Sequence, residues 1–197
     1  MTLAIVRSRA LDGLDAAAVR VEVHLANGLP AFTLVGLAET EVKESRERVR
    51  AAFANNGLAF PTNKCIVVNL ASAELPKEGG RFDLPIALGL LAASGQIDAA
   101  KLEGLECAGE LSLAGELRPV HGALAMSLAL RRERSERSLI LPEASATEAA
   151  LVRGVKVLRA RHLLDLVAAL APENSTPLEQ AVSAHCDPSA RAVGSAG

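Results

Sequence analysis

The stretch at 75–88, with the sequence LPKEGGRFDLPIAL, constrains the fold of this chain more than any other. It joins an apolar run at 65–70, typical of a buried strand, to a second apolar run at 83–94 that is long enough for a helix. Its paired glycines allow a positive φ or a close approach to neighbouring backbone. We expect Asp83 to be the N-cap of the helix, with Pro85 in the first turn, where its missing N–H does no harm.

This central loop has the form of a binding or catalytic site but lacks the usual chemistry. In many folds a glycine loop that opens a helix holds a phosphate or presents a nucleophile. Here the loop offers no serine, and no Gly-Lys dipeptide of a Walker A motif occurs in the 197 residues. Its residues of interest are Lys77, Gly79, Gly80, Arg81 and Asp83.

The composition predicts one domain followed by a tail. Half of the residues are hydrophobic but only four are Phe and none is Trp or Tyr, so the core must be aliphatic. We place the domain at 1–171 and a linker or disordered tail at 172–197, where small polar residues dominate, with a short helix at 178–184. The net charge of -2 excludes a basic field over the whole chain, so any contact with nucleic acid must be local.

Cysteine usage and hydropathy favour a cytoplasmic protein. The three cysteines are scattered and form no CxxC pair, which is typical of reduced thiols. No apolar run is long enough to span a bilayer, and we expect no contact with a membrane. His, Cys and carboxylate residues do not show the spacing of a metal site, so we predict no metal or cofactor in this chain.

Strand and helix patterns alternate along the first 170 residues, as in an α/β protein. An apolar run at 3–9 predicts the first strand. The segment at 18–25 alternates apolar and polar residues, and turn residues at 27–30 separate it from another strand pattern at 31–35. We therefore predict a hairpin between these two strands.

A helix is predicted to follow, with Thr40 as its N-cap, one apolar face and a Glu44–Arg48 pair at i,i+4. Other cations, among them Arg46 and Arg50, lie mostly off the apolar face. Their spacing favours a solvated amphipathic face, with nucleic acid or a partner subunit as the alternative contact.

Several motifs together resemble the amino-terminal domain of the ComM/YifB family, bacterial AAA+ ATPases often called magnesium-chelatase-like. The resemblance covers about 2–170 and departs from the family pattern at Ala38 and Ser72, where proline is expected. The motifs are VGL at 35–37, VKESRERVR at 42–50, NLA at 69–71, the stretch at 75–88, AASGQ at 92–96 and GELSLAGELRPV at 109–120.

The resemblance implies a Lon protease-like fold (ribosomal protein S5 domain 2-like), that is, an α/β arrangement with a mixed sheet and flanking helices. Lon uses a Ser–Lys dyad, in which the lysine activates the serine. When the Lon motifs are laid over this chain, Arg81 takes the position of the serine and Leu124 that of the lysine. Neither residue can do that chemistry, so the resemblance predicts that the domain is not an enzyme.

The resemblance further implies an accessory role in DNA processing, namely branch migration in natural transformation. ATP and Mg²⁺ would belong to the AAA+ module, which is absent from this chain, and the family assembles as a hexamer. Arg46, Arg50 and Arg81 are the candidate contacts to DNA or to a neighbouring subunit. The alternatives are a peptidase with a displaced dyad, for which Ser72 and Lys77 are the candidates, and a subunit that acts with a magnesium chelatase.

Overall fold

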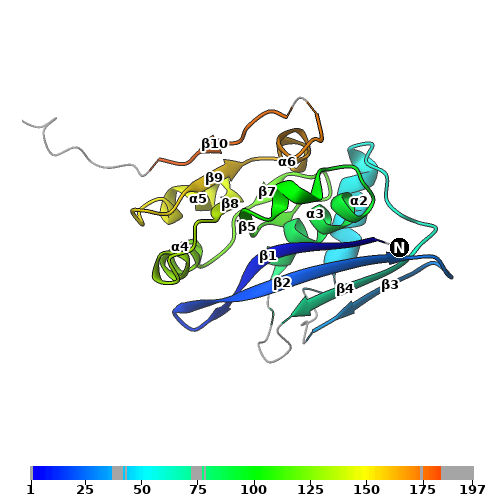
Figure 1. Cartoon of the computed structure of the whole chain (residues 1–197), viewed down its shortest axis with the longest axis horizontal. Coiled ribbons are helices and arrows are strands. Elements are labelled where there is room, and N and C mark those ends of the chain that lie inside the picture. Colours follow the sequence, from blue (N-terminus) through cyan, green and yellow to red (C-terminus); the bar gives the residue numbers. More distant parts are fainter. Residues whose placement is uncertain are drawn as a thin grey trace, which may run out of the picture.

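The computed structural model describes residues 2–36, 42, 44–71, 77, 79–173 and 175–182. Within these residues the chain forms an eight-stranded mixed sheet and a separate small hairpin, with helices packed on the sheet (Figure 1). The order of strands is β10-β9-β8-β5-β1-β2-β4-β3, so the first strand of the chain lies inside the sheet. The predicted α/β class, with a mixed sheet and flanking helices, is confirmed.

The strands of the large sheet are β1 (Thr2–Asp12), β2 (Asp15–Ala26), β3 (Ala31–Val35), β4 (Cys65–Ala71), β5 (Leu105–Cys107), β8 (Ser138–Pro142), β9 (Val157–Ala160) and β10 (Glu179–Gln180). The small hairpin is β6 (Glu110–Leu111) with β7 (Leu117–Arg118). The helices are α2 (Ser45–Asn55), α3 (Asp83–Ala93), α4 (Ala123–Arg132), α5 (Glu143–Ala149) and α6 (Leu163–Ala169), with 3-10 turns η1 (Gly80–Phe82) and η2 (Ala99–Leu102). No helix in the described part of the chain has the length and apolar character needed to cross a membrane.

Two hydrophobic cores lie on opposite faces of the sheet. In β8, Ile140 belongs to the core that includes residues of α2, α3 and α6, whereas Leu139 and Leu141 belong to the core formed with α4 and α5. Since successive side chains of a strand point to opposite faces, the two cores are separated by the sheet. On β1, the side chains of Leu3 and Ile5 are exposed.

Helix α3 is the central element of the larger core. All of its residues are buried, as expected of a helix that is apolar all round. Its Gly89 permits a close approach to β2, because an added Cβ would lie 2.4 Å from Cγ2 of Val23. Helix α3 therefore packs closely against the middle of the sheet.

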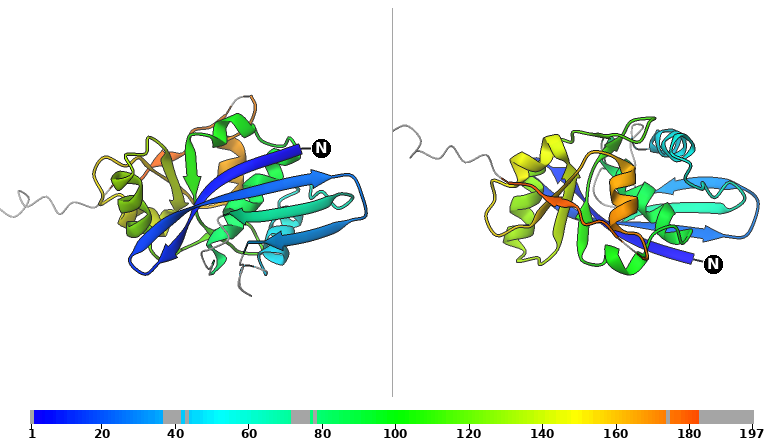
Figure 2. Two further views of the ribbon diagram at one scale, coloured as in Figure 1. Left: turned by 60° about the horizontal axis from the view of Figure 1, so that its bottom comes forward. Right: turned by 90° about the horizontal axis from the view of Figure 1, so that it is seen from above.

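The predicted hairpin between 18–25 and 31–35 is wrong. Strand β2 pairs antiparallel with β1 and with β4, and β3 pairs parallel with β4 (Figure 2). The tight hairpin of this sheet is instead β1–β2, whose turn contains Gly13 at φ 60. Strand β4, which comes later in the chain, lies between β2 and β3, so the turn chemistry at 27–30 redirects the chain without pairing the strands on either side.

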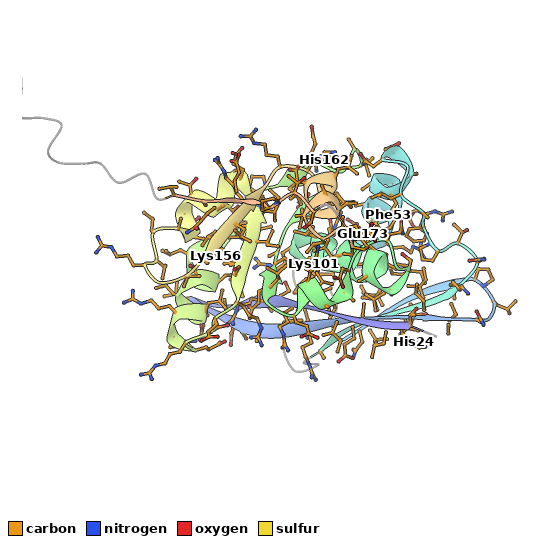
Figure 3. The ribbon with its side chains drawn as sticks, turned by 45° about the horizontal axis from the view of Figure 1, so that its top comes forward. His24, Phe53, Lys101, Lys156, His162 and Glu173 are labelled. Carbon is orange, nitrogen blue, oxygen red and sulfur yellow. The ribbon has the colours of Figure 1, made fainter. Side chains whose placement is uncertain are left out.

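The carboxyl-terminal part contains helix α6 and the edge strand β10. Helix α6 follows His162 (labelled in Figure 3), whose Nδ1 accepts a hydrogen bond from the Leu164 N–H at 3.1 Å. The helix predicted at 178–184 is wrong in its described part, because Glu179–Gln180 form β10 antiparallel to β9. The boundary at 171 and the tail at 172–197 stay predictions, although the sheet includes residues beyond that boundary.

Arg9, on β1, is only 1% exposed and connects three elements of the fold. Its guanidinium donates hydrogen bonds to Glu106 on β5 at 2.7 Å, to Glu133 just after α4 at 2.6 Å, and to the carbonyl oxygen of Ala16 at 2.9 Å. Burial by itself lowers the pKa of Arg9, but the hydrogen bonds to Glu133 and Glu106 outweigh it and raise that pKa above its ordinary value. The buried cation thus ties the central strands to the helical layer over them.

We expect the variant Arg9→Met to lower the free energy of unfolding by about 3–5 kcal/mol, because it leaves the Glu106 carboxylate buried without its main counter-charge. Adding Glu106→Gln to this variant should restore part of the loss. The control Arg132→Met removes the ion pair between Arg132 and Asp15, whose side chains are 64% and 50% exposed, respectively. It should change the free energy of unfolding by less than about 1 kcal/mol. Chemical denaturation measures all three variants, and equal losses for Arg9→Met and Arg132→Met would contradict the role of Arg9.

The same variant should show a pH signature. The hydrogen bond with Arg9 lowers the pKa of Glu133 below its ordinary value of 4.5. A lowered carboxyl pKa stabilises the fold above the unfolded pKa, and that stabilisation is lost as the pH falls through the folded pKa. The difference in Tm between the wild type and Arg9→Met should therefore narrow when the pH falls below 4.5.

Candidate functional site

The central loop lies where α2, α3 and the β6–β7 hairpin meet. Gly79 has φ 70, which a glycine adopts without strain, and η1 then turns directly into α3. Two main-chain hydrogen bonds fix this turn to Gly109: the Gly109 N–H donates to the Arg81 carbonyl at 2.9 Å, and the Leu84 N–H donates to the Gly109 carbonyl at 3.0 Å. The predicted use of glycine in this loop is confirmed at Gly79.

Asp83 does not cap α3, so that prediction is wrong. It is the first helical residue, with φ -57 and ψ -49, and its carboxylate is fully buried. Both of its oxygens accept hydrogen bonds from the Arg48 guanidinium, at 2.6 and 3.0 Å, and Oδ2 also accepts one from the Leu111 N–H at 3.1 Å. The carboxylate is directed toward α2 and β6, where the Arg48 guanidinium gives it charge-assisted hydrogen bonds and a strand N–H gives it a third.

The electrostatics of this pair reflect its burial. Burial raises the pKa of Asp83 above its ordinary value, while the hydrogen bonds from Arg48, Ser45 and Leu111 act in the opposite direction. The hydrogen bond to Asp83 raises the pKa of Arg48. Glu44 also pairs with Arg48 at 3.5 Å, so the predicted i,i+4 pair is present, but it lies on the more exposed side.

A hollow of about 390 Å³ opens beside this loop, and we call it the loop hollow. Its walls come from the start of α2, from the central loop and from the segment after β7. They are formed by Glu44, Arg48, Gly79, Gly80, Arg81, Glu110, Pro119, Val120 and His121. A Cβ at Gly80 would lie 2.5 Å from Cγ of Glu110, so a larger residue there would require the Glu110 side chain to move.

The two positions that the resemblance laid over the Lon dyad lie on segments that contact each other. Arg81 is 8% exposed, and its Nη2 donates to the His121 carbonyl at 3.3 Å, three residues before Leu124. Leu124 is half-buried in the first turn of α4, where its N–H donates to the Glu148 carboxylate. The side chains at these positions are a guanidinium engaged with the main chain and an aliphatic group, neither of which is a nucleophile or a base.

The three arginines predicted as contacts do not form one surface. Arg46 and Arg50 line a second hollow beside β3, whereas Arg81 lies in the wall of the loop hollow. Because Arg81 is buried, the exposure on which its predicted contact depended is not found. Arg46 and Arg50 remain accessible on α2.

Lys77, the other cation of the central loop, is fully buried, and burial lowers its pKa below the ordinary value for lysine. Its candidate partner Ser72 lies outside the described residues, and so does the predicted cap Thr40. Among the described residues, no group of three or more His, Cys, Asp or Glu side chains is arranged to hold a metal ion.

Comparison of the sequence with known proteins identifies the family to which the chain belongs. Residues 21–145 match the family described as subunit ChlI of Mg-chelatase. Competence protein ComM of Haemophilus influenzae is 51% identical over 178 residues, which cover 90% of this chain and 34% of that protein. The chain belongs to the ChlI-like ComM/YifB family.

Two YifB proteins give the same result. YifB of Salmonella typhimurium is 48% identical over 182 residues, or 91% of this chain and 35% of that protein. YifB of Escherichia coli is 50% identical over 163 residues, or 83% of this chain and 32% of that protein. The chain thus spans about a third of the length of the curated relatives it matches, consistent with a domain of a larger ComM-like protein. The family match at 21–145 includes every wall of the loop hollow.

We expect Asp83→Asn to lower the free energy of unfolding by about 2–4 kcal/mol, because the Arg48 guanidinium would lose the carboxylate that neutralises it. The matched control is Glu44→Gln, which removes the second carboxylate that pairs with Arg48. Since the Glu44 side chain is 63% exposed, this control should cost less than about 1 kcal/mol. Denaturant titration separates the two variants, and a larger loss for Glu44→Gln would show that Asp83 is not the main partner.

Proposed function

We propose that this chain is a non-catalytic accessory domain of a ComM/YifB-type AAA+ ATPase, with a Lon protease-like fold, and that it serves assembly or the positioning of DNA. In this proposal the AAA+ module of the same protein binds ATP and Mg²⁺. The working form is a homo-oligomer, a hexamer by resemblance, and the process is branch migration of DNA in natural transformation. The word "competence" in the name of the Haemophilus influenzae relative agrees with this setting.

The observation that carries the non-catalytic part of the proposal is the state of Arg81. This residue takes the position of the Lon serine, and it is buried with its guanidinium hydrogen-bonded to the His121 carbonyl. A guanidinium stays protonated and cannot act as a nucleophile. The position therefore joins the central loop to the segment before α4, which is a structural task.

The positioning part of the proposal depends on the accessible cations of α2. Arg46 and Arg50 lie on the side of the helix next to the edge strand β3, with the Arg46 side chain 51% exposed. The buried residues of the same helix, Val49, Ala52 and Phe53, hold it against the core. The helix can therefore present charge to a partner without losing its packing.

Reversing the charge of both cations, Arg46→Glu with Arg50→Glu, should disturb the full-length protein. We expect the affinity for DNA, or the fraction of assembled oligomer at a fixed concentration, to fall at least about fivefold, because a partner surface matched to positive charge would now be repelled. Fluorescence anisotropy with labelled DNA and native mass spectrometry measure the two readouts.

The matched control is Arg131→Glu, a charge reversal at an exposed position at the end of α4. It should leave both readouts within about twofold of the wild type, since rim charges away from an interface have little effect on affinity. If the double variant behaves like this control in both assays, these arginines have no part in DNA positioning or assembly.

A peptidase with a displaced dyad is the second candidate, because one observation favours it. Lys77 is fully buried and burial lowers its pKa, which is the change that prepares a lysine to act as a base. Ser72 precedes it in the same segment of the sequence. Burial also lowers the pKa of lysines that have no catalytic role, so this feature alone is weaker than the state of Arg81.

A serine-directed fluorophosphonate probe distinguishes the two candidates. For an accessory domain we expect no labelling of the chain above the background of a heat-denatured sample, because no serine is activated. Labelling that disappears in Ser72→Ala and in Lys77→Met, while both variants keep the wild-type circular dichroism spectrum, would replace the accessory role by a hydrolase.

A further inference from the structure

Strand β3 forms one edge of the sheet and borders a groove on the side of α2. It is the last strand in the order, and among the described residues its only strand partner is β4. The outermost position of β3 is visible in both views of Figure 2. An edge strand presents a row of main-chain N–H and C=O groups that can pair with another extended segment.

Two hollows run along this edge and share Phe32 and Arg46. One of about 390 Å³ lies between the start of β3, α2 and the connection before β4, and the other, of about 370 Å³, continues along β3 to Leu34. We call the two together the edge groove. Its apolar residues include Phe32, Phe60 and Ile66, so it combines an apolar floor with the free edge of the sheet.

The edge groove is positively charged. Arg46, Arg50 and Lys64 line it, and no carboxylate lines it within the described part of the chain. Glu47 pairs with Arg46 at 2.6 Å, but its side chain is 61% exposed and does not line the groove. In a chain whose net charge is -2, this local excess of cations points to an anionic occupant.

The packing of the aromatic rings favours a peptide over a nucleic acid. Base stacking requires a free aromatic face. Phe60 lies edge-to-face against Phe53 with ring centroids 5.6 Å apart, and the Arg50 guanidinium lies 6.0 Å from the Phe60 centroid. Phe32 is packed half-buried against the core. Pairing of β3 with β3 of a second copy is disfavoured as well, since it would bring two sets of the same cations together.

We propose that the edge groove binds an extended acidic peptide segment, which adds a strand to β3 and directs alternate carboxylates toward Arg46, Arg50 and Lys64. The peptide residues between those carboxylates would lie on the opposite face of the sheet, next to Val35, whose side chain is 42% exposed. We therefore expect apolar residues to be preferred at these peptide positions. This proposal names the kind of partner that the domain would bind in its proposed assembly role, and it therefore rests on that role. Its test is separate from the labelling with a serine probe.

The probe is a fluorescein-labelled peptide of about ten residues in which glutamate alternates with valine, titrated with the 197-residue chain and followed by anisotropy. We expect saturable binding, and none to a matched peptide with lysine in place of glutamate. Arg46→Glu and Lys64→Glu should each weaken binding about fivefold or more, whereas Arg131→Glu should change it less than twofold. Equal binding by all three variants would overturn the proposal.

Main-chain pairing has a signature of its own. Since alternate residues of a strand direct their N–H groups to opposite edges, N-methylation of one alternate set should weaken binding about tenfold and methylation of the other set should be tolerated. If N-methylation weakens binding at both alternate sets of residues, or at neither set, strand addition is excluded.

A labelled single-stranded oligonucleotide of similar charge is the final comparison. If it displaces the acidic peptide and binds more tightly, the groove is a nucleic-acid site and the peptide proposal is wrong. If neither ligand binds, the edge groove has no such role, while the non-catalytic accessory function still depends on the labelling result.

Discussion

The ion pair between the buried Asp83 carboxylate and the partly buried Arg48 guanidinium is the interaction on which the arrangement of the central loop depends. It joins the first residue of α3 to α2, and the Leu111 N–H joins both to β6. A buried carboxylate is stable only when its hydrogen bonds are satisfied by fixed partners, so α2, α3 and β6 must hold one relative geometry. Arg48 on α2 and Glu110 on β6 line the loop hollow, so this part of its wall depends on the same geometry.

Arg9 has a comparable role at the middle of the sheet. One face of β1 packs against α3, and on its other face Arg9 reaches Glu106 and Glu133 below the end of α4. Replacement of a buried ion pair by apolar residues is often neutral or stabilising, so a pair like this is weak evidence for optimised stability. In the observed register of β1, Arg7 lies opposite Glu106 of β5 and the Arg9 guanidinium contacts both carboxylates.

Local sequence signals predicted individual turns and helices better than the contacts between elements that are distant in the sequence. The turn at Gly79 and the apolar helix at 83–94 follow from short-range preferences, and both are found. The partner of Asp83 was missed because a carboxylate at a helix start has the same local pattern whether it caps the helix or pairs with a distant arginine. The parallel pairing of β3 with β4 was missed for a related reason: turn residues at 27–30 indicate a change of direction but not which strand arrives beside it.

The contrast between the loop hollow and the edge groove bears on where a partner binds this family. Both cations and carboxylates line the loop hollow, where Arg48 pairs with Glu44 and Arg81 bonds to the main chain. In the edge groove the cations line one side of an apolar floor, next to main-chain groups at the edge of the sheet. The geometry of the central loop is thus set largely by contacts within the fold, whereas β3 presents main-chain groups at the edge of the sheet, which is the feature that strand addition uses.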